Sequence, residues 1–96
     1  MPVKTIPYDA AEDLAAPEDQ AELLSEAFAS GDAKFIAVAL GTVARARGMS
    51  AIADKAGVTR PGLYKALGPS GDPQLSTLLG VVNALGFRLA LEKTAP

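Results

Sequence analysis

The sequence predicts an all-α domain of five to six helices, followed by one short β-strand near the C-terminus. Three observations support this prediction. Apolar residues recur at helical spacing in residues 33–47 and 73–85, which is typical of amphipathic helices. Glycine, which commonly ends a helix, stands just past each predicted helix or at a corner between two helices: Gly31, Gly48, Gly57, Gly68 and Gly86. The spacing changes to alternation in residues 87–92, which predicts the strand.

The composition excludes several functional classes. The 96 residues are enough for one domain, and 49% of them are hydrophobic, which suffices for a core. The chain contains neither Cys nor His, so it lacks disulfides, thiolate metal ligands and the usual general base. We therefore expect no enzyme activity, no metal and no cofactor. No apolar run approaches the roughly 18 residues of a membrane span, and the N-terminus lacks an apolar signal region, so we expect a soluble cytoplasmic protein.

Charge is distributed unevenly along the chain. Residues 1–32 contain one basic and eight acidic residues, whereas residues 33–96 contain eight basic and three acidic residues, so their net charges are −7 and +5. An acidic part and a basic part suggest two surfaces with different partners. The single domain, 1–96, is divided into an acidic N-terminal helical arm at 1–31, a helical core at 32–86 and a C-terminal strand at 87–93.

The acidic arm is predicted to contain two helices. Asp9 followed by Glu12 is a capping-box pattern and predicts a short helix over residues 9–15, after an extended or frayed start. Pro17 opens the next helix, whose first turn is acidic, and Gly31 ends it. Its inward stripe consists of Leu24, Ala27 and Phe28.

The core begins with the strongest helical period in the chain. Asp32 is the predicted N-cap, and the inward positions of this central helix are Phe35, Val38, Ala39, Thr42 and Val43, widened by Ile36 and Leu40. Later in the core, Asp72 and Pro73 predict the start of the last helix. Its apolar stripe consists of Leu75, Leu78, Leu79 and Val82.

Residues 49–67 predict two short helices joined by a glycine corner. Ser50 is the expected cap of the first helix, and Ala53 must be small if the second helix crosses over it. Gly57 occupies the corner, where a positive φ is expected. Val58 then fills the corner with an apolar side chain.

The second of these helices is predicted to present a polar face. Thr59 is its expected cap and Pro61 lies in its first turn. Leu63 and Leu67 point into the core, which leaves four residues facing outward: Arg60, Gly62, Tyr64 and Lys65. This order is that of a DNA-binding helix-turn-helix, whose second helix enters the major groove. The alternative is an αα-hairpin within an ordinary helical domain.

Each residue of this motif has a predicted role toward a double-stranded DNA operator. Arg60 is the candidate for a bidentate bond to guanine, and the alternative is a solvated surface Arg. Thr59 and Ser50 combine capping with phosphate contact. Gly62 lets the backbone approach the groove, while Pro61 stiffens the helix.

Three further residues are candidates for phosphate contact. Lys65 is expected to contact a phosphate or to be solvated, and Tyr64 to contact DNA or to pack on the central helix. Arg47, like Arg45, lies in the last turn of the central helix, where it contacts flanking phosphates or complements the helix dipole.

The predicted C-terminal strand needs a partner for its backbone. It can pair with residues 3–6, with the same strand of a second copy, or with another protein, and otherwise it is a frayed tail. Pairing with a second copy gives a homodimer, which is the usual DNA-binding form of helix-turn-helix proteins.

The chain resembles the HigA-like antidote proteins of type II toxin–antitoxin modules, which carry a Cro/repressor-type helix-turn-helix. The resemblance extends from about Asp9 to Leu89, and its most specific part is residues 62–67. The matching residues are 9–12, 31–32, 44–50, Ala53, Gly57, Thr59–Arg60, 62–67, 71–73 and 84–86. Pro61 and Asp72 depart from the family pattern, and Pro61 removes one side chain that would touch a base.

The resemblance implies that the chain neutralises a RelE-like ribonuclease toxin and represses their shared operon. Because such toxins are usually basic, the acidic residues 1–31 are the expected toxin-binding part. The alternatives are a phage- or operon-type repressor without a toxin, and an interaction module whose basic face binds an acidic protein. An enzyme is disfavoured because the carboxylates near Asp9 have no His, Cys or phosphate loop beside them.

Overall fold

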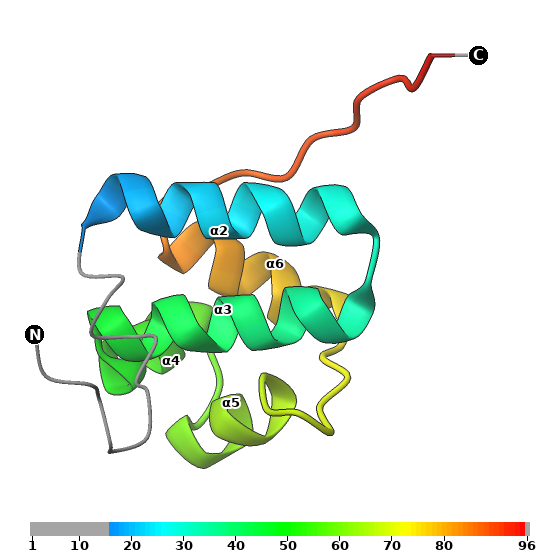
Figure 1. The fold of residues 1–96 in the computed structure, drawn as a ribbon. Coiled ribbons are helices and arrows are strands. Elements are labelled where there is room, and N and C mark those ends of the chain that lie inside the picture. The colour runs from blue at the N-terminus through cyan, green and yellow to red at the C-terminus, as the bar shows by residue number, and fades with distance from the viewer. Residues whose placement is uncertain (1–15, 96) are drawn as a thin grey trace, which may run out of the picture.

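The computed structural model describes residues 16–95, which contain five helices and no strand (Figure 1). The helices are α2 (Pro17–Ser30), α3 (Ala33–Arg47), α4 (Met49–Ala56), α5 (Arg60–Ala66) and α6 (Leu75–Ala84). The predicted all-α class is therefore confirmed, and the predicted helix at residues 9–15 lies outside the described residues.

The helices pack around one core. Helices α2 and α3 form an antiparallel pair, and α4 joins them to both α5 and α6 (Figure 1). The largest fully buried side chains are Leu40, Leu63, Leu85, Val43 and Val81. Each buried side chain of this size contributes about 1.5–3 kcal/mol relative to exposure. Helix α2 adds Leu24 and Ala27 to the same core, so α2 is packed against the rest of the described domain.

Local chemistry sets the bounds of α2 and α3. Gly31 ends α2 with a φ of 70°, as predicted, and Pro17 stands at its first turn. Asp32 Oδ1 accepts hydrogen bonds from the backbone N–H groups of Lys34 (3.0 Å) and Phe35 (3.3 Å), which confirms the predicted N-cap of α3.

Two predicted caps are wrong. Helix α4 begins at Met49 with Gly48 as its N-cap, because a single residue separates it from α3, so Ser50 already lies inside the first turn. Asp72 does not cap α6, which begins at Leu75 after an extended Gln74 (φ −62°, ψ 154°). Neither α4 nor α6 has a side-chain cap hydrogen bond.

The predicted C-terminal strand is not present in the described residues. Residues 87–95 are extended, but no described segment pairs with them, and a strand is held by hydrogen bonds to a neighbour (Figure 1). The segment is attached at its start, where the Phe87 N–H donates to the Val82 carbonyl at 3.0 Å. Three residues predicted to face inward are instead exposed: Val38, Leu75 and Leu79.

A helix that crosses a membrane needs a long apolar stretch. Within residues 16–95 no single helix is long and apolar enough to cross a bilayer. Helices α3 and α4 reach such a length and apolar composition only together, and the chain bends by 115° between them.

Candidate functional site

The corner between α4 and α5 has the predicted geometry. Gly57 adopts a φ of 75°, which is strained for any residue with a side chain. The Gly57 N–H donates to the Asp54 carbonyl at 3.2 Å, and the Val58 N–H to the Ala53 carbonyl at 3.0 Å. Ala53 is buried and Val58 packs against the core. These bonds end α4 and turn the chain sharply into α5.

The start of α5 is fixed by Thr59, as predicted. Its Oγ1 accepts a hydrogen bond from the Gly62 N–H at 3.1 Å, and Pro61 lies in the first turn. A Cβ at position 62 would lie 2.9 Å from Thr59 Oγ1, so a larger residue there would crowd the cap. Glycine at 62 therefore has a structural role in addition to the predicted approach to DNA.

Helix α5 is anchored on one side and exposed on the other. Leu63 and Leu67 are buried beneath it, as the sequence predicts. Six exposed residues form what we call the α5 face: Thr59, Arg60, Pro61, Gly62, Tyr64 and Lys65. Figure 1 shows α5 at the opposite end of the molecule from α2 and the C-terminal segment.

Arg60 is held in place on the α5 face. Its guanidinium carbon lies 5.3 Å from the centroid of the Tyr64 ring, which is a cation–π distance. At an exposed position such a contact contributes about 0.5–1 kcal/mol. Tyr64 is 42% exposed, and its ring lies beside Arg60 at the start of the helix; both alternatives predicted for Tyr64 stay predictions.

Arg47 lies elsewhere and has a role that the sequence did not predict. Its Nε donates to Gln20 Oε1 at 2.8 Å and its Nη1 to the Leu85 carbonyl at 2.7 Å. The guanidinium also lies 5.9 Å from the centroid of the Phe87 ring. Arg47 therefore joins α2 to the end of α6. Its predicted phosphate contact stays a prediction, and so does that of Ser50, which is exposed on α4.

A depression of about 440 Å³ adjoins the α5 face, and the sequence analysis did not identify it. Helix α5 and the residues leading into α6 form it, with polar side chains from Lys65, Ser70, Asp72, Gln74 and Thr77. Because α6 has no side-chain cap, the N–H groups of its first turn are available to an acceptor. The Ser, Gln and Thr residues around the start of this helix were the signal that sequence reasoning passed over.

The charges around these surfaces differ in sign. Helix α2 carries Glu18, Asp19, Glu22 and Glu26, all exposed, and no basic residue. The α5 face carries Arg60 and Lys65 and no acidic residue.

Within residues 16–95 no cluster of three or more His, Cys, Asp or Glu residues is arranged to hold a metal ion.

The fold and the site define a small helical protein in which the capped helix α5 is exposed and two leucines, Leu63 and Leu67, are buried beneath it. Residues 4–93 match the family model described as "Probable addiction module antidote protein". The chain belongs to this family, and the family supports an antitoxin role in a toxin–antitoxin module, with a cognate toxin as partner.

An uncharacterized protein of Haemophilus influenzae strain Rd is 39% identical over 87 residues, which cover 91% of this chain and 90% of that protein. No solved structure gave a significant match.

Proposed function

We propose that this chain is a HigA-like, sequence-specific DNA-binding antitoxin, which neutralises a RelE-like ribonuclease toxin and represses its own operon. In this proposal it has no enzyme activity and acts by binding alone, as a cytoplasmic homodimer. Membership of the antidote family favours this function over a repressor without a toxin.

The observation that carries the DNA-binding part is the capped, exposed helix α5. In a helix-turn-helix of the Cro/repressor type, the second helix enters the major groove with its N-terminal residues against the bases. Arg60 is at this end, is exposed, and lies beside the Tyr64 ring. A guanidinium in that place bonds guanine O6 and N7 together, so we assign Arg60 to base recognition.

Phosphate contacts position the helix in the groove. Lys65 lies on the same face as Arg60, and α5 contains no acidic residue. The depression beside it is lined by Ser70, Gln74 and Thr77 and also by Asp72, whose carboxylate would repel a phosphate. We therefore assign the phosphate contact to Lys65 rather than to this depression, since such contacts fix register without reading sequence.

A homodimer supplies two copies of α5 for two half-sites of an operator. Helix-turn-helix dimers bind half-sites about 34–36 Å apart, one helical turn of DNA. We therefore expect an operator with two-fold symmetry upstream of the gene that encodes this chain. Sedimentation of the free protein tests the dimer independently of DNA.

The toxin-binding part rests on charge. Helix α2 presents four acidic and no basic side chains, which suits a basic toxin. Because α2 lies at the far end of the molecule from α5, both partners can bind at once (Figure 1).

A footprint on the upstream DNA tests the proposed function as a whole. The full chain is titrated on this DNA alone and with the product of the adjacent gene. Protection of a two-fold symmetric site, together with a complex between the two proteins, is the expected result. Protection without any complex would leave a repressor without a toxin, and the absence of protection would contradict the DNA-binding proposal.

A further inference from the structure

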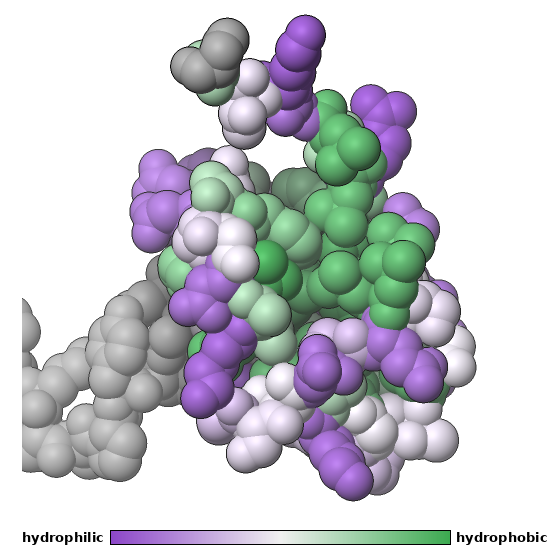
Figure 2. Space-filling model, turned by 90° about the vertical axis from the view of Figure 1, so that its right-hand side faces the viewer, coloured by the Kyte–Doolittle hydropathy of each residue, from purple (hydrophilic) through white to green (hydrophobic). Residues whose placement is uncertain are grey.

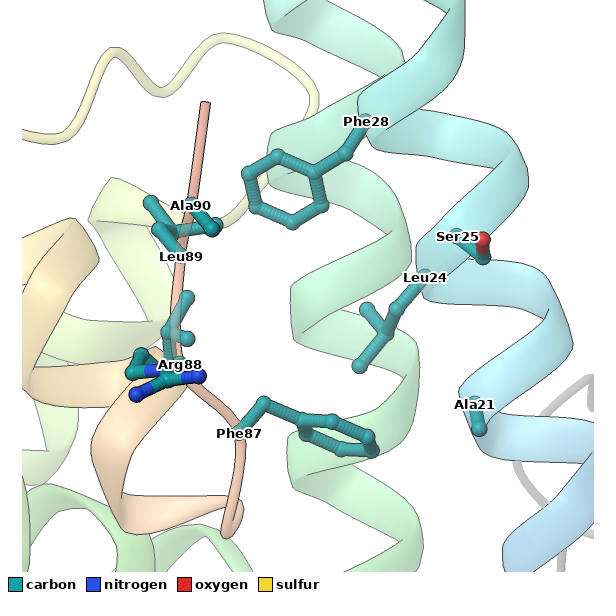
Figure 3. Close-up of a pocket in the computed structure, with 9 residues that line it drawn as sticks. Ala21, Leu24, Ser25, Phe28, Phe87, Arg88, Leu89 and Ala90 are labelled. Carbon is teal, nitrogen blue, oxygen red and sulfur yellow. The ribbon is translucent and has the colours of Figure 1, made fainter. Parts of the chain in front are cut away.

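An apolar groove lies between α2 and the C-terminal segment, residues 87–95 (Figure 3). Its volume is about 440 Å³. Phe28 of α2 and Phe87 after α6 both extend their rings into the space between the two walls. Arg88 and Leu89 line the groove from the C-terminal side, and Arg88 is the charged residue in its lining. The groove therefore offers an apolar surface beside one positive charge.

The backbone of the C-terminal segment is extended and unpaired. The Phe87 N–H donates to the Val82 carbonyl, but residues 88–95 make no backbone hydrogen bond within the part of the chain that the structure describes. Leu91 is fully exposed. Figure 2 shows hydrophobic side chains gathered on the face below this segment. An extended backbone with free donors and acceptors beside an apolar surface is a template for an added strand.

The order of residues in the segment is complementary to itself. Two copies related by a two-fold axis pair their strands antiparallel, so each contact occurs twice. Directly opposite residues lie on the same face of such a pair. With the axis at Ala90, Arg88 stands opposite Glu92 of the second copy, and Leu89 stands opposite Leu91 of the second copy. Charges of opposite sign then meet on one face, and leucines meet on the other.

Other registers of the same two strands lose this match. An axis at Arg88 or at Glu92 sets like charges opposite each other, which is destabilising. An axis at Leu89 or at Leu91 leaves Arg88 without the opposing carboxylate. An axis between two of these residues sets a leucine opposite a charged side chain. Charge and hydropathy therefore select the register in which the axis passes through Ala90.

We propose that two copies of this chain dimerise through an antiparallel ribbon of residues 87–93, in which Leu91 of each copy covers the groove of the other. This inference rests on the homodimer proposed above and names its contact surface. Because Leu89 lines the groove, the opposing Leu91 reaches the same apolar surface and leaves water. Arg88 in the lining pairs with Glu92 of the second copy.

The two other partners expected from the sequence fit this segment less well. Residues 3–6 contain Lys4 and no acidic residue, so they offer Arg88 no carboxylate. A different protein would have to supply a large apolar and an acidic side chain in adjacent positions. The second copy supplies both by symmetry, as Leu91 and Glu92.

Charge reversal in the full chain tests the register. Arg88→Glu sets Glu opposite Glu92, and Glu92→Arg sets Arg opposite Arg88, so each variant alone meets like charges twice. By sedimentation equilibrium, we expect each to raise the dimer dissociation constant at least about tenfold at low salt, and less as salt screens the charges. An equimolar mixture of the two variants restores opposite charges only across two copies, so it should form heterodimers about as tightly as the wild type. A mixture that stays monomeric would overturn the register.

Removing a charge is a milder change than reversing it. Arg88→Ala loses the two ion pairs but introduces no repulsion. Arg88 and Glu92 are both exposed, and exposed ion pairs contribute little affinity. This variant should therefore remain a dimer. A loss of the dimer as large as that of Arg88→Glu would contradict like-charge repulsion as the cause.

Leu91→Asp tests the apolar contact. Because Leu91 is fully exposed in the single chain, the variant should keep the wild-type helix content by circular dichroism. We expect its dimer dissociation constant to rise at least about tenfold, the range of an interface hot spot. Leu75→Asp is the matched control, since Leu75 is 68% exposed on α6 and does not line the groove. It should change the constant by less than about twofold.

The outcomes separate this inference from the proposed function. A wild-type chain that is monomeric at every concentration would overturn the proposed homodimer and the ribbon together. A dimer that resists Leu91→Asp and both charge reversals would overturn the ribbon and leave a homodimer formed through another surface. Equal weakening by Leu75→Asp and Leu91→Asp would also overturn the ribbon, because it would place the contact on α6.

Discussion

The α5 face and the apolar groove between α2 and the chain after α6, called the α2 groove below, differ in the way the chain builds them. The α5 face is basic, and residues 57–67 build it through contacts between near neighbours. The α2 groove is largely apolar, with Arg88 as the charged residue in its lining, and residues more than 50 positions apart build it. The difference shows how one small helical domain can carry two unlike surfaces at opposite ends.

The two surfaces share one scaffold. Leu63 beneath α5 and Leu24 beside the groove belong to the same core. Arg47 links α2 to the end of α6 and so supports the groove rather than the α5 face. Changes to the core should therefore affect both surfaces.

The largest effect is expected from Leu63→Ala, because this side chain is fully buried. The variant should lose about 2–5 kcal/mol of the free energy of unfolding, the usual cost of such a cavity. Denaturant unfolding measures it, and DNA and toxin binding should weaken together. Leu75→Ala, at a side chain that is 68% exposed, is the control. A similar loss for both variants would contradict the described core.

Arg47→Met separates a structural role from a DNA contact. The change leaves the Leu85 carbonyl without its donor and removes one bond to the buried Gln20. The expected loss is about 1–3 kcal/mol in the free energy of unfolding. Arg45→Met, at an exposed position on the same helix, should cost almost nothing. If Arg47→Met instead weakens DNA binding without destabilising the fold, the phosphate contact predicted from sequence is favoured.

Thr59→Ala tests the cap that fixes the start of α5. Removing the hydroxyl leaves the Gly62 N–H without its acceptor and should cost about 0.5–2 kcal/mol in stability. Thr59→Ser keeps an oxygen at this place and should retain most of the stability. Thermal unfolding of the two variants distinguishes them, and equal melting temperatures would count against the cap.

The smallest effect is expected from Lys65→Ala. If this side chain contacts one phosphate, affinity should fall by a similar factor on every DNA sequence, and the slope of log K against log salt should become shallower by about 0.9. Lys93→Ala, on the C-terminal segment, should leave the slope unchanged. A change confined to the operator sequence would instead indicate a base contact.

Sequence reasoning succeeded where a few neighbouring residues determine the structure. Asp32, Gly57 and Thr59 act at positions whose backbone chemistry favours their residue types, and the structure confirms all three. It failed for Ser50 and Asp72, where the same residue types stand near a helix start without capping it. Whether a suitable residue caps depends on where the preceding helix ends, which local sequence does not specify.

The features that the sequence did not predict involve contacts between residues that are far apart in the sequence. Nothing near Arg47 in the sequence indicates Gln20 or the Leu85 carbonyl as its partners. The α2 groove likewise exists only once the chain after α6 lies beside α2. The alternation in residues 87–92 was a correct sign of extended backbone, but a strand also needs a neighbour, and residues 16–95 supply none.

The most direct measurement is a titration of the upstream operator with the wild-type chain, Arg60→Ala and Arg88→Ala. Both variants lose one positive charge, but Arg88 lines the α2 groove at the far end of the molecule. Arg60→Ala should bind about 1–3 kcal/mol more weakly and lose selectivity at one base pair, while Arg88→Ala binds as the wild type does. Equal affinity of Arg60→Ala and the wild type, with selectivity intact, would contradict the assignment of α5 to the major groove.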